Sequence, residues 1–560
     1  MPLLLVLFFA FACGHAASAP AGRRPNPNAP SRLSGSDNSM AAQISEETHA
    51  LLRDEGNLLW ARWTTGSGPL PASAVASHPR LSQRESIEIV IAAAGHASGD
   101  DARALRLLAQ QLSTLALTRE AGADIEALER ARAQLAFAVP GNGQIMVGER
   151  DLDRLLIDEP NAQKRAALAQ SEAKAALTLA PLAISRDAAV SKAIDALGLD
   201  SWAATEERAH GVSIADLAKL AEATLTATEA VGQRAVAAAS LRNIGVTADR
   251  LRRSDLPRLA RTTLADPQFT PGSAWANART ALEKIGAPPP QTLRVDAEPS
   301  PSKGARPLAL LVDPPTDVRL SLRPTGGFEE QRATLHEGAR AVGATLIDVD
   351  RWELAQLGDG SAAEGVALLF ESLAGQPEWL RATTQLRGEP LDDVVHTEAA
   401  RRLLTVRRAA AMVLFEIRRR DGEQSAEAQS ALYRGLLQRA LYCILSDDDA
   451  GRWALEADVF ASSVTPLLGG ILAAQMERHF GSLWWSGERP ALKEIWSKGR
   501  SLGALEAARV LGLAQLDPAV LAAVIDERMG YSAPDAPPPA PKPDYKYMQG
   551  DKKKRRKKKR

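Results

Sequence analysis

A histidine and a glutamate, His336 and Glu337, stand next to each other in a segment expected to be helical. In the pattern H-E-x-x-H, two histidines one helical turn apart bind Zn²⁺, and the glutamate between them acts as a general base. Here Arg340 stands at the place of the second histidine. A guanidinium has donors only and stays protonated, so it offers no lone pair to a metal ion and repels one. This residue therefore decides whether the segment can support metal-dependent chemistry.

Two glutamates further along the chain share a helix face. Glu364 lies 28 residues beyond His336, and Glu371 follows seven residues later. Seven residues make two helical turns, so the two side chains point the same way. Without a metal ion, these carboxylates and that of Glu337 need neutralising. We expect the guanidinium of Arg340 to take the metal position and to fork onto Glu364 or Glu337.

The elements that must position these residues are predicted to be strands before His336 and helices after it. Short runs rich in β-type residues, bounded by Pro and Gly, predict a small sheet ahead of His336; they are Thr292–Asp296, Ala309–Val312 and Asp317–Leu322. A Gly326-Gly327 turn follows, and then the helix that carries His336. Helices are expected again from Gly360 to about Arg528.

This order of sheet, His-Glu helix and glutamate helix resembles the gluzincin peptidases, in particular the thimet oligopeptidase and oligoendopeptidase F families. In those families a ligand glutamate and a second glutamate seven residues on share one helix, and Glu364 and Glu371 match them. The resemblance covers about Leu251 to Gly530. Its other matching segments are Leu251–Arg258, Asp317–Leu320 with Gly326-Gly327, Arg407–Glu416 and Pro466–Gln475.

The resemblance implies a mostly α, elongated fold with a small β-sheet beside the metal-site helix and a central channel. It also implies that His336 and Glu364 are remnant metal ligands and that Glu337 is the general base of an active relative. The families stabilise the oxyanion with Tyr or His from a late loop. The corresponding places here hold Phe460, Val464 and Leu468, which cannot donate.

Other histidines are not expected to replace the missing ligand. His396 and His479 could fold near the site, but a lone histidine on a helix is more often structural than a ligand. His96 and His210 lie in the N-terminal half, where these families have no ligands. Tryptophans 352, 379, 484, 485 and 496 could line a channel, and we expect them to be core residues instead.

Three functions stay open. The first is a non-catalytic pseudopeptidase of the bacterial cell envelope, which keeps the channel for a peptide or protein partner and needs no cofactor. The second is an active zinc metallopeptidase, with His336 and Glu364 as ligands and Glu337 activating the metal-bound water. The third is a structural envelope protein that holds a surface through its C-terminal tail.

Composition favours an all-helical chain, since hydrophobic residues make up 45%, aromatic residues only 4%, and strong helix formers abound. Apolar residues at three- and four-residue spacing predict helices at Glu46–Trp63, Ser82–Ala97, Asp100–Ala116, Asp124–Phe137, Pro160–Leu177 and Pro181–Leu197, and one or two in Val212–Ala239. We expect a signal peptide at 1–19, a flexible tether at 20–44, a helical domain at 45–286, a degenerate peptidase-like domain at 287–530 and a disordered tail at 531–560.

The first residues predict secretion across the inner membrane. Leu3–Ala12 is an apolar run too short to span a bilayer, and Cys13 follows it as in a bacterial lipobox. Lipidation of Cys13 would anchor the protein in the envelope, whereas cleavage after Ala19 is the competing interpretation. Cys443 is the other cysteine, so a disulfide framework in the body is excluded. No second membrane span is expected.

The C-terminal run Lys552–Arg560 contains nine basic residues, and without the last ten residues 59 basic and 67 acidic residues remain. Such a run predicts contact with an anionic membrane surface or another polyanion, without specific nucleic-acid recognition. Nine charges near an anionic surface contribute about 1 kcal/mol each and are weakened by salt. A solubilising tail without a partner is the alternative.

Overall fold

The computed structural model describes residues 36–199, 201–459 and 461–531. Cys13, Phe460 and the basic run Lys552–Arg560 lie outside these described residues. Helices account for 71% of these described residues and strands for 5%, as the composition predicts. None of the helices within the described ranges is long and apolar enough to cross a membrane.

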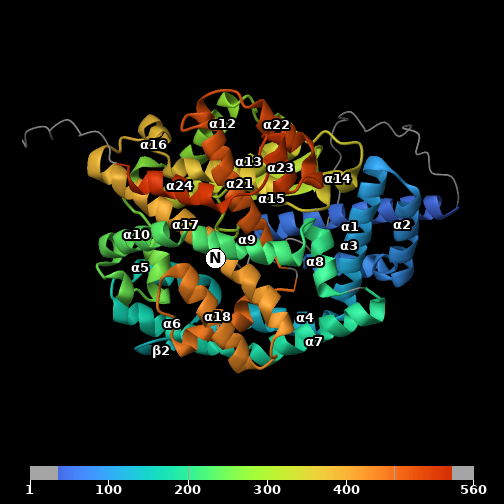
Figure 1. Cartoon of the computed structure of the whole chain (residues 1–560), viewed down its shortest axis with the longest axis horizontal. Coiled ribbons are helices and arrows are strands. Elements are labelled where there is room, and N and C mark those ends of the chain that lie inside the picture. The colour runs from blue at the N-terminus through green and yellow to red at the C-terminus, as the bar shows by residue number, and fades with distance from the viewer. Residues whose placement is uncertain (1–35, 200, 460, 532–560) are drawn as a thin grey trace, which may run out of the picture.

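The helices of the N-terminal half confirm the predicted periodicity (Figure 1). Their bounds are α1 (Ser36–Thr65), α2 (Arg84–His96), α3 (Gly99–Glu120), α4 (Gly122–Gln134), α5 (Leu152–Asp158), α6 (Ala162–Leu177), α7 (Ala180–Leu197), α8 (Trp202–His210), α9 (Ile214–Ala227), α10 (Glu229–Ala239), α11 (Leu256–Leu259) and α12 (Ser273–Lys284). Figure 1 shows α1–α3 together at one end of the molecule, with α4, α6 and α7 along its lower edge.

Two boundaries differ from the sequence-based prediction. The predicted tether extends to residue 44, but α1 already begins at Ser36, because Ala41 and Ile44 are fully buried and continue its apolar face. The predicted helix at Asp124–Phe137 ends earlier, and Phe137 lies instead in strand β1 (Ala136–Val139). This strand pairs with β2 (Asn142–Gly148) through a turn at Gly141, whose positive φ of 82° suits glycine.

The predicted small sheet is present directly before the His336 helix. Its strands are β3 (Arg294–Asp296), β4 (Leu308–Asp313) and β5 (Asp317–Ser321), in the spatial order β3-β5-β4. β4 runs antiparallel to β5, and β3 runs parallel to it. β4 is therefore an edge strand, and α1 and the His336 helix both pack against it.

The helices of the C-terminal half begin with the one that carries His336, α13 (Phe328–Thr345). The others are α14 (Trp352–Gln356), α15 (Ser361–Glu371), α16 (Pro377–Thr383), α17 (Gly388–Asp421), α18 (Ala426–Leu441), α19 (Asp447–Ala450), α20 (Trp453–Glu456), α21 (Val464–Phe480), α22 (Pro490–Ser497), α23 (Ala504–Val510) and α24 (Pro518–Met529). α13, α15, α21 and α23 lie close together in Figure 1, and contacts join α15 to the other three.

The largest hydrophobic core joins both halves of the chain. It contains side chains from Leu128 to Ile525, on both sides of the predicted boundary between residues 286 and 287. One continuous core therefore crosses this boundary, and the division into two domains stays a prediction. Four of the five tryptophans expected in the core are buried, namely Trp379, Trp484, Trp485 and Trp496. The fifth, Trp352, stacks on His49 of α1 with ring centroids 4.6 Å apart.

Two glycines allow α15 and α21 to approach closely beside Glu364. A Cβ on Gly365 would lie 2.8 Å from Cδ2 of the buried Leu472 and 3.3 Å from the carbonyl oxygen of Gly469. A Cβ on Gly469 would in turn lie 3.0 Å from Cγ of Glu364. The position of the Glu364 carboxylate therefore depends on the absence of side chains at this crossing.

Gly365→Ala is accordingly expected to destabilise the protein by about 1–3 kcal/mol, because the added methyl group overpacks the crossing. Gly435→Ala is the matched control, since Gly435 lies in the interior of α18 and a Cβ there would meet no atom within 4 Å. There, alanine should stabilise by about 0.5–1 kcal/mol through its higher helix propensity. Chemical unfolding of both variants measures the difference, and equal stability of the two would contradict this account of the crossing.

A buried acid in α1 makes a second stability prediction. Glu55 is 1% exposed, and its Oε1 atom has no hydrogen-bond partner. Burial raises the pKa of Glu55 well above its usual value. The folded protein thus keeps this carboxyl protonated at pH values where the unfolded chain has ionised it. Because the unfolded state then binds fewer protons, this group makes folding less favourable as pH rises above about 4.5.

Glu55→Gln is expected to match the wild type in stability near pH 4 and to be increasingly more stable than it up to pH 8. Glu88→Gln provides the control, because the Glu88 side chain is 60% exposed and pairs only with Arg84 on the same helix. Urea unfolding across this pH range tests the expectation. Parallel stability curves for the wild type and Glu55→Gln would show that the Glu55 carboxyl is not kept neutral.

Candidate functional site

The structure brings four of the predicted site residues together between α13 and α15. Nδ1 of His336 lies 2.9 Å from Oε2 of Glu371, and its Nε2 lies 3.5 Å from Oε2 of Glu364. Nε2 also lies 3.9 Å from Oε1 of Glu337. The imidazole ring is therefore held between two carboxylates that are two turns apart on α15, as their spacing in the sequence predicts.

The protonation states in this cluster are coupled. Burial alone would lower the pKa of His336, but Glu364 and Glu371 outweigh it and raise that pKa to about 10. Burial alone would raise the pKa of Glu364, but His336 and then Arg340 bring it below its usual value. The pKa of Glu371 is also lowered against burial, by Arg401 and His336. In this arrangement the site holds an imidazolium between two carboxylates.

Glu337 is engaged on both of its oxygens. Oε2 accepts a hydrogen bond of 2.8 Å from the backbone N–H of Ala309, on the edge strand β4. Nη1 of Arg340 lies 3.4 Å from each oxygen of the same carboxylate. The predicted fork from Arg340 onto Glu364 or Glu337 is thus a contact to Glu337, through one nitrogen rather than two. The Arg340 side chain keeps 29% of its surface exposed.

A chain of alternating charges continues from Glu371 away from the histidine. Nη2 of Arg401 donates to Glu371 over 2.8 Å, and its Nε donates to Glu398 over 2.8 Å. Glu398 lies 4.0 Å from Arg332, which in turn bonds to Glu329. We call this series, from Glu329 to Glu364 through His336, the charge ladder. No local sequence signal points to Arg401, since it lies on α17, 65 residues beyond His336.

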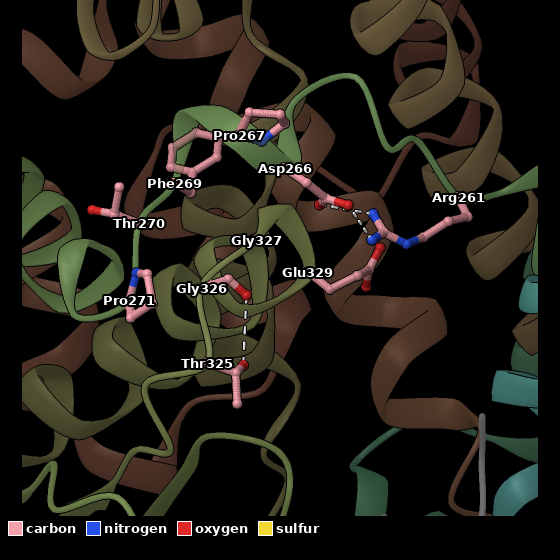
Figure 2. Close-up of a pocket in the computed structure, with 10 residues that line it drawn as sticks. All are labelled: Arg261, Asp266, Pro267, Phe269, Thr270, Pro271, Thr325, Gly326, Gly327 and Glu329. Atoms are coloured by element: carbon pink, nitrogen blue, oxygen red, sulfur yellow. Dashed lines mark hydrogen bonds and ion pairs between the residues drawn. The ribbon is translucent and has the colours of Figure 1, made fainter.

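The outer end of the charge ladder reaches a cavity of about 460 Å³ in front of α13 (Figure 2). The Gly326-Gly327 turn and Glu329 line it on one side, and Arg261 and Asp266 on another. Asp266 caps α13 by accepting the N–H of Phe328 over 2.9 Å, and Arg261 forks onto it. These charges already satisfy one another, and the cavity is separate from the cluster around His336.

A second charged cluster lies at the N-terminal end of α15. His210, on α8, has Nδ1 3.7 Å from Asp359 and Nε2 3.6 Å from Glu206. Burial lowers the pKa of His210, but these two carboxylates outweigh it and raise the pKa to about 9. Asp359 also accepts the N–H of Ser361, at the start of α15. His210 thus links the N-terminal half to the helix of Glu364, which its place in the sequence did not indicate.

The other candidate residues lie away from the cluster. Nε2 of His396 is 2.9 Å from the carbonyl oxygen of Tyr531, and His479 packs against the ring of Phe480. Val464 and Leu468 are buried on α21. Within residues 36–199, 201–459 and 461–531, no group of three or more His, Cys, Asp and Glu side chains is arranged to hold a metal ion.

Comparison with known proteins supports the fold. No family model matches the sequence, and no curated protein matches it. Among 141 matching chains of solved structures is a crystal structure described as "putative Oligoendopeptidase F", which superposes with a TM-score of 0.63. The match covers 88% of this chain and 91% of that chain, at 11% sequence identity. At this identity the likeness shows the fold alone: the chain has an oligoendopeptidase-like, mostly helical fold, as the resemblance predicts.

Proposed function

We propose that this protein is a non-catalytic pseudopeptidase, which uses an oligoendopeptidase-like fold to bind a peptide or a protein segment without cleaving it. One observation carries the proposal: Arg340 stands at the second ligand position and contacts the carboxylate of the would-be base, Glu337. The match to a solved oligoendopeptidase-like fold supports the peptide-binding part. The same proposal includes three further points. The chain belongs to the oligoendopeptidase F-like family, it keeps a channel for the peptide, and His336 and Glu364 are remnants of a metal site.

The donor set of the site does not fit a zinc ion. A catalytic zinc site requires three protein ligands and an open position for water. Of the three ligand positions in the motif, those of His336 and Glu364 hold possible ligands, and the third presents the guanidinium of Arg340, which cannot coordinate. Glu337 meanwhile accepts a hydrogen bond from the N–H of Ala309 and lies beside the positive charge of Arg340, which disfavours its protonation and makes it a weaker general base. The residues present therefore favour binding over hydrolysis.

The proposal also includes a cellular location for the protein, the bacterial envelope. A secretion signal with lipidation at Cys13 would tether it to the bacterial envelope, and Lys552–Arg560 would contact anionic lipid or another polyanion. Mass spectrometry of the mature N-terminus tests the first part: a diacylated Cys13 supports the tether, and an unmodified Met1 contradicts it.

Peptide binding and cleavage are separated by one experiment on the purified full-length chain. Fluorescent nonapeptides with randomised sequence are added with and without a chelator, and binding is followed by anisotropy and cleavage by mass spectrometry. We expect saturable binding, intact peptides and no effect of the chelator. Cleavage that the chelator stops, and that Glu337→Gln abolishes, would overturn the proposal in favour of an active zinc peptidase.

A further inference from the structure

The cavity in front of α13 offers room for a ligand and walls of two chemical kinds (Figure 2). Its volume of about 460 Å³ lies within the range of roughly 300–1,000 Å³ that is usual for small-ligand sites. Pro267 and Pro271, both exposed, line it with apolar rings, and Glu329 lines it with a carboxylate. Arg261 and Asp266 neutralise each other, so Glu329 is the lining charge that is left to meet a ligand.

Two glycines fix the shape of this cavity. Gly326 and Gly327 have positive φ angles of 79° and 93°, which favour glycine. A Cβ on Gly326 would lie 2.9 Å from Cδ of Pro271, and a Cβ on Gly327 would lie 3.3 Å from Oδ1 of Asp266. The N–H of Gly327 donates to the carbonyl oxygen of Phe269 over 2.8 Å. The two lining segments are therefore tied together, and a side chain at either glycine would crowd the opposite wall.

The carboxylate of Glu329 keeps hydrogen-bonding capacity for a ligand. Its Oε2 atom accepts a bond from Arg332, and its Oε1 atom has no donor among the residues that the structure describes. A carboxylate can accept about four hydrogen bonds. The Glu329 side chain is 42% exposed, whereas those of Glu364, Glu371 and Glu398 in the charge ladder are 11%, 16% and 4% exposed. Glu329 is thus the accessible acid of the ladder.

The charges around the cavity favour a cation. The charge ladder has four carboxylates and three cations, hence one net negative charge, and the adjacent pair of Glu337 and Arg340 adds none. Glu330, the next residue after Glu329, accepts hydrogen bonds from Thr325 and has no cationic partner among the described residues. These two acids outweigh the helix dipole of α13, which is equivalent to about half a positive charge. Acids are common in a first helical turn, and the apolar cavity beside them is what marks a site.

An aliphatic chain with a positive end matches these walls. Lys and Arg side chains lay their methylene groups on apolar surface while the charged end reaches a polar partner. Such an end at Oε1 of Glu329 would form a charge-assisted hydrogen bond. Glu329 and His336 are seven residues apart on α13, which is about 10 Å along the helix. An extended peptide covers that length in about three residues, so a segment held near His336 can place one basic group in the cavity.

We propose that this cavity binds a basic group of the bound peptide, with Glu329 as the acceptor and with Pro267 and Pro271 against the aliphatic stem. This inference rests on the proposed function, because it names which peptides the protein prefers. The basic group is an ammonium or a guanidinium. It comes from a Lys or Arg side chain or from the peptide's N-terminus, and the experiment distinguishes these two sources.

The experiment uses the full-length chain at neutral pH and three pools of nonapeptides, each with an uncharged fluorophore on an amidated C-terminus. Their randomised positions lack Lys, Arg, His, Asp and Glu. The first pool has Lys or Arg at the central position and an acetylated N-terminus. The second has norleucine at that position and an acetylated N-terminus, and the third has norleucine and a free N-terminus.

We expect the first pool to bind about tenfold more tightly than the second, which is the range expected for one charge-assisted hydrogen bond. Tight binding of the third pool in place of the first would support the site and assign the basic group to the N-terminus. This comparison uses the wild type alone, so it stands even where a variant fails to fold.

Glu329→Gln tests the residue itself, because glutamine keeps the shape of the side chain and removes its charge. It should bring the first pool to the affinity of the second and leave the second unchanged. Glu283→Gln is the matched control, since Glu283 is 49% exposed and pairs with Arg279 on the same helix, as Glu329 pairs with Arg332. The control should keep the full preference for the basic pool.

The outcomes separate the two claims. Equal affinity of the three pools for the wild type would overturn the cation site and leave the proposed peptide binding intact. Failure of these pools and of the fully randomised nonapeptides to bind would overturn the proposed function, and the cation site with it. A preference that persists in Glu329→Gln, or that both variants lose equally, would assign it to other residues or to overall charge and would overturn the inference.

Discussion

Arg340→His is expected to bind about one Zn²⁺ per chain, whereas the wild type is expected to bind essentially none. The substitution restores a neutral nitrogen donor one helical turn after His336, and Glu364 lies 3.5 Å from His336 on the neighbouring helix. Glu371 is already placed to accept a proton from Nδ1 of His336 over 2.9 Å. Such a carboxylate orients a histidine so that its other nitrogen faces a metal ion.

Metal analysis after dialysis against trace zinc measures this effect. Arg434→His, a change of the same type on the surface of α18, controls for zinc that binds to any added histidine. The double variant Arg340→His/Glu364→Gln should lose the metal again, because a neutral amide is a poorer zinc ligand than a carboxylate. Stoichiometric zinc in the wild type would contradict the reasoning about Arg340, and no zinc in Arg340→His would show that more than one residue has departed from a metal site.

Arg401→Met is expected to destabilise the folded protein by about 3–5 kcal/mol, which is the usual cost of removing one partner from a buried ion pair. The Arg401 side chain is 14% exposed and bridges two carboxylates, Glu371 and Glu398, which are 16% and 4% exposed. Without it, Glu398 keeps only Arg332, 4.0 Å away, and Glu371 keeps only His336 as its ion-pair partner. Two carboxylates with little access to water would then share too little positive charge.

Arg418→Met is the control for this loss, because Arg418 lies on the same helix and pairs with Glu222 at 46% exposure. An exposed pair of this kind contributes about 0–1 kcal/mol. Unfolding in urea at neutral pH compares the two variants. If Arg401→Met were no less stable than Arg418→Met, the charge ladder would not contribute to the stability of the site.

The motif residues could be predicted from the sequence because their relations are local. His336, Glu337 and Arg340 lie within about one turn of one helix, and Glu364 and Glu371 lie two turns apart on another. Helical periodicity fixes which of them share a face. The small sheet was equally readable, since Pro and Gly bound each of its strands. The hairpin of β1 and β2 was missed because alanine and phenylalanine at its start continue a helical pattern.

The partners of these residues could not be predicted, because the fold alone brings them together. Arg401 reaches Glu371 from α17, and Ala309 reaches Glu337 through a backbone N–H, which no side-chain pattern records. Arg500 comes to the start of α15 from a short turn 140 residues after Gly360. In the same way His210 of the N-terminal half meets Asp359 of the C-terminal half. The sequence thus identifies the residues of the cluster, and tertiary packing determines the charge that each one meets.

The charge ladder bears on whether the site needs a metal ion from its surroundings. Its positive charges belong to side chains of His336, Arg401 and Arg332, so they are attached to the polypeptide and are present as soon as it folds. A loaded metalloenzyme must acquire its ion and can lose it to scavengers. Under the proposed function, the chain supplies its own fixed cations, and the site would need no zinc supply to reach the geometry described above.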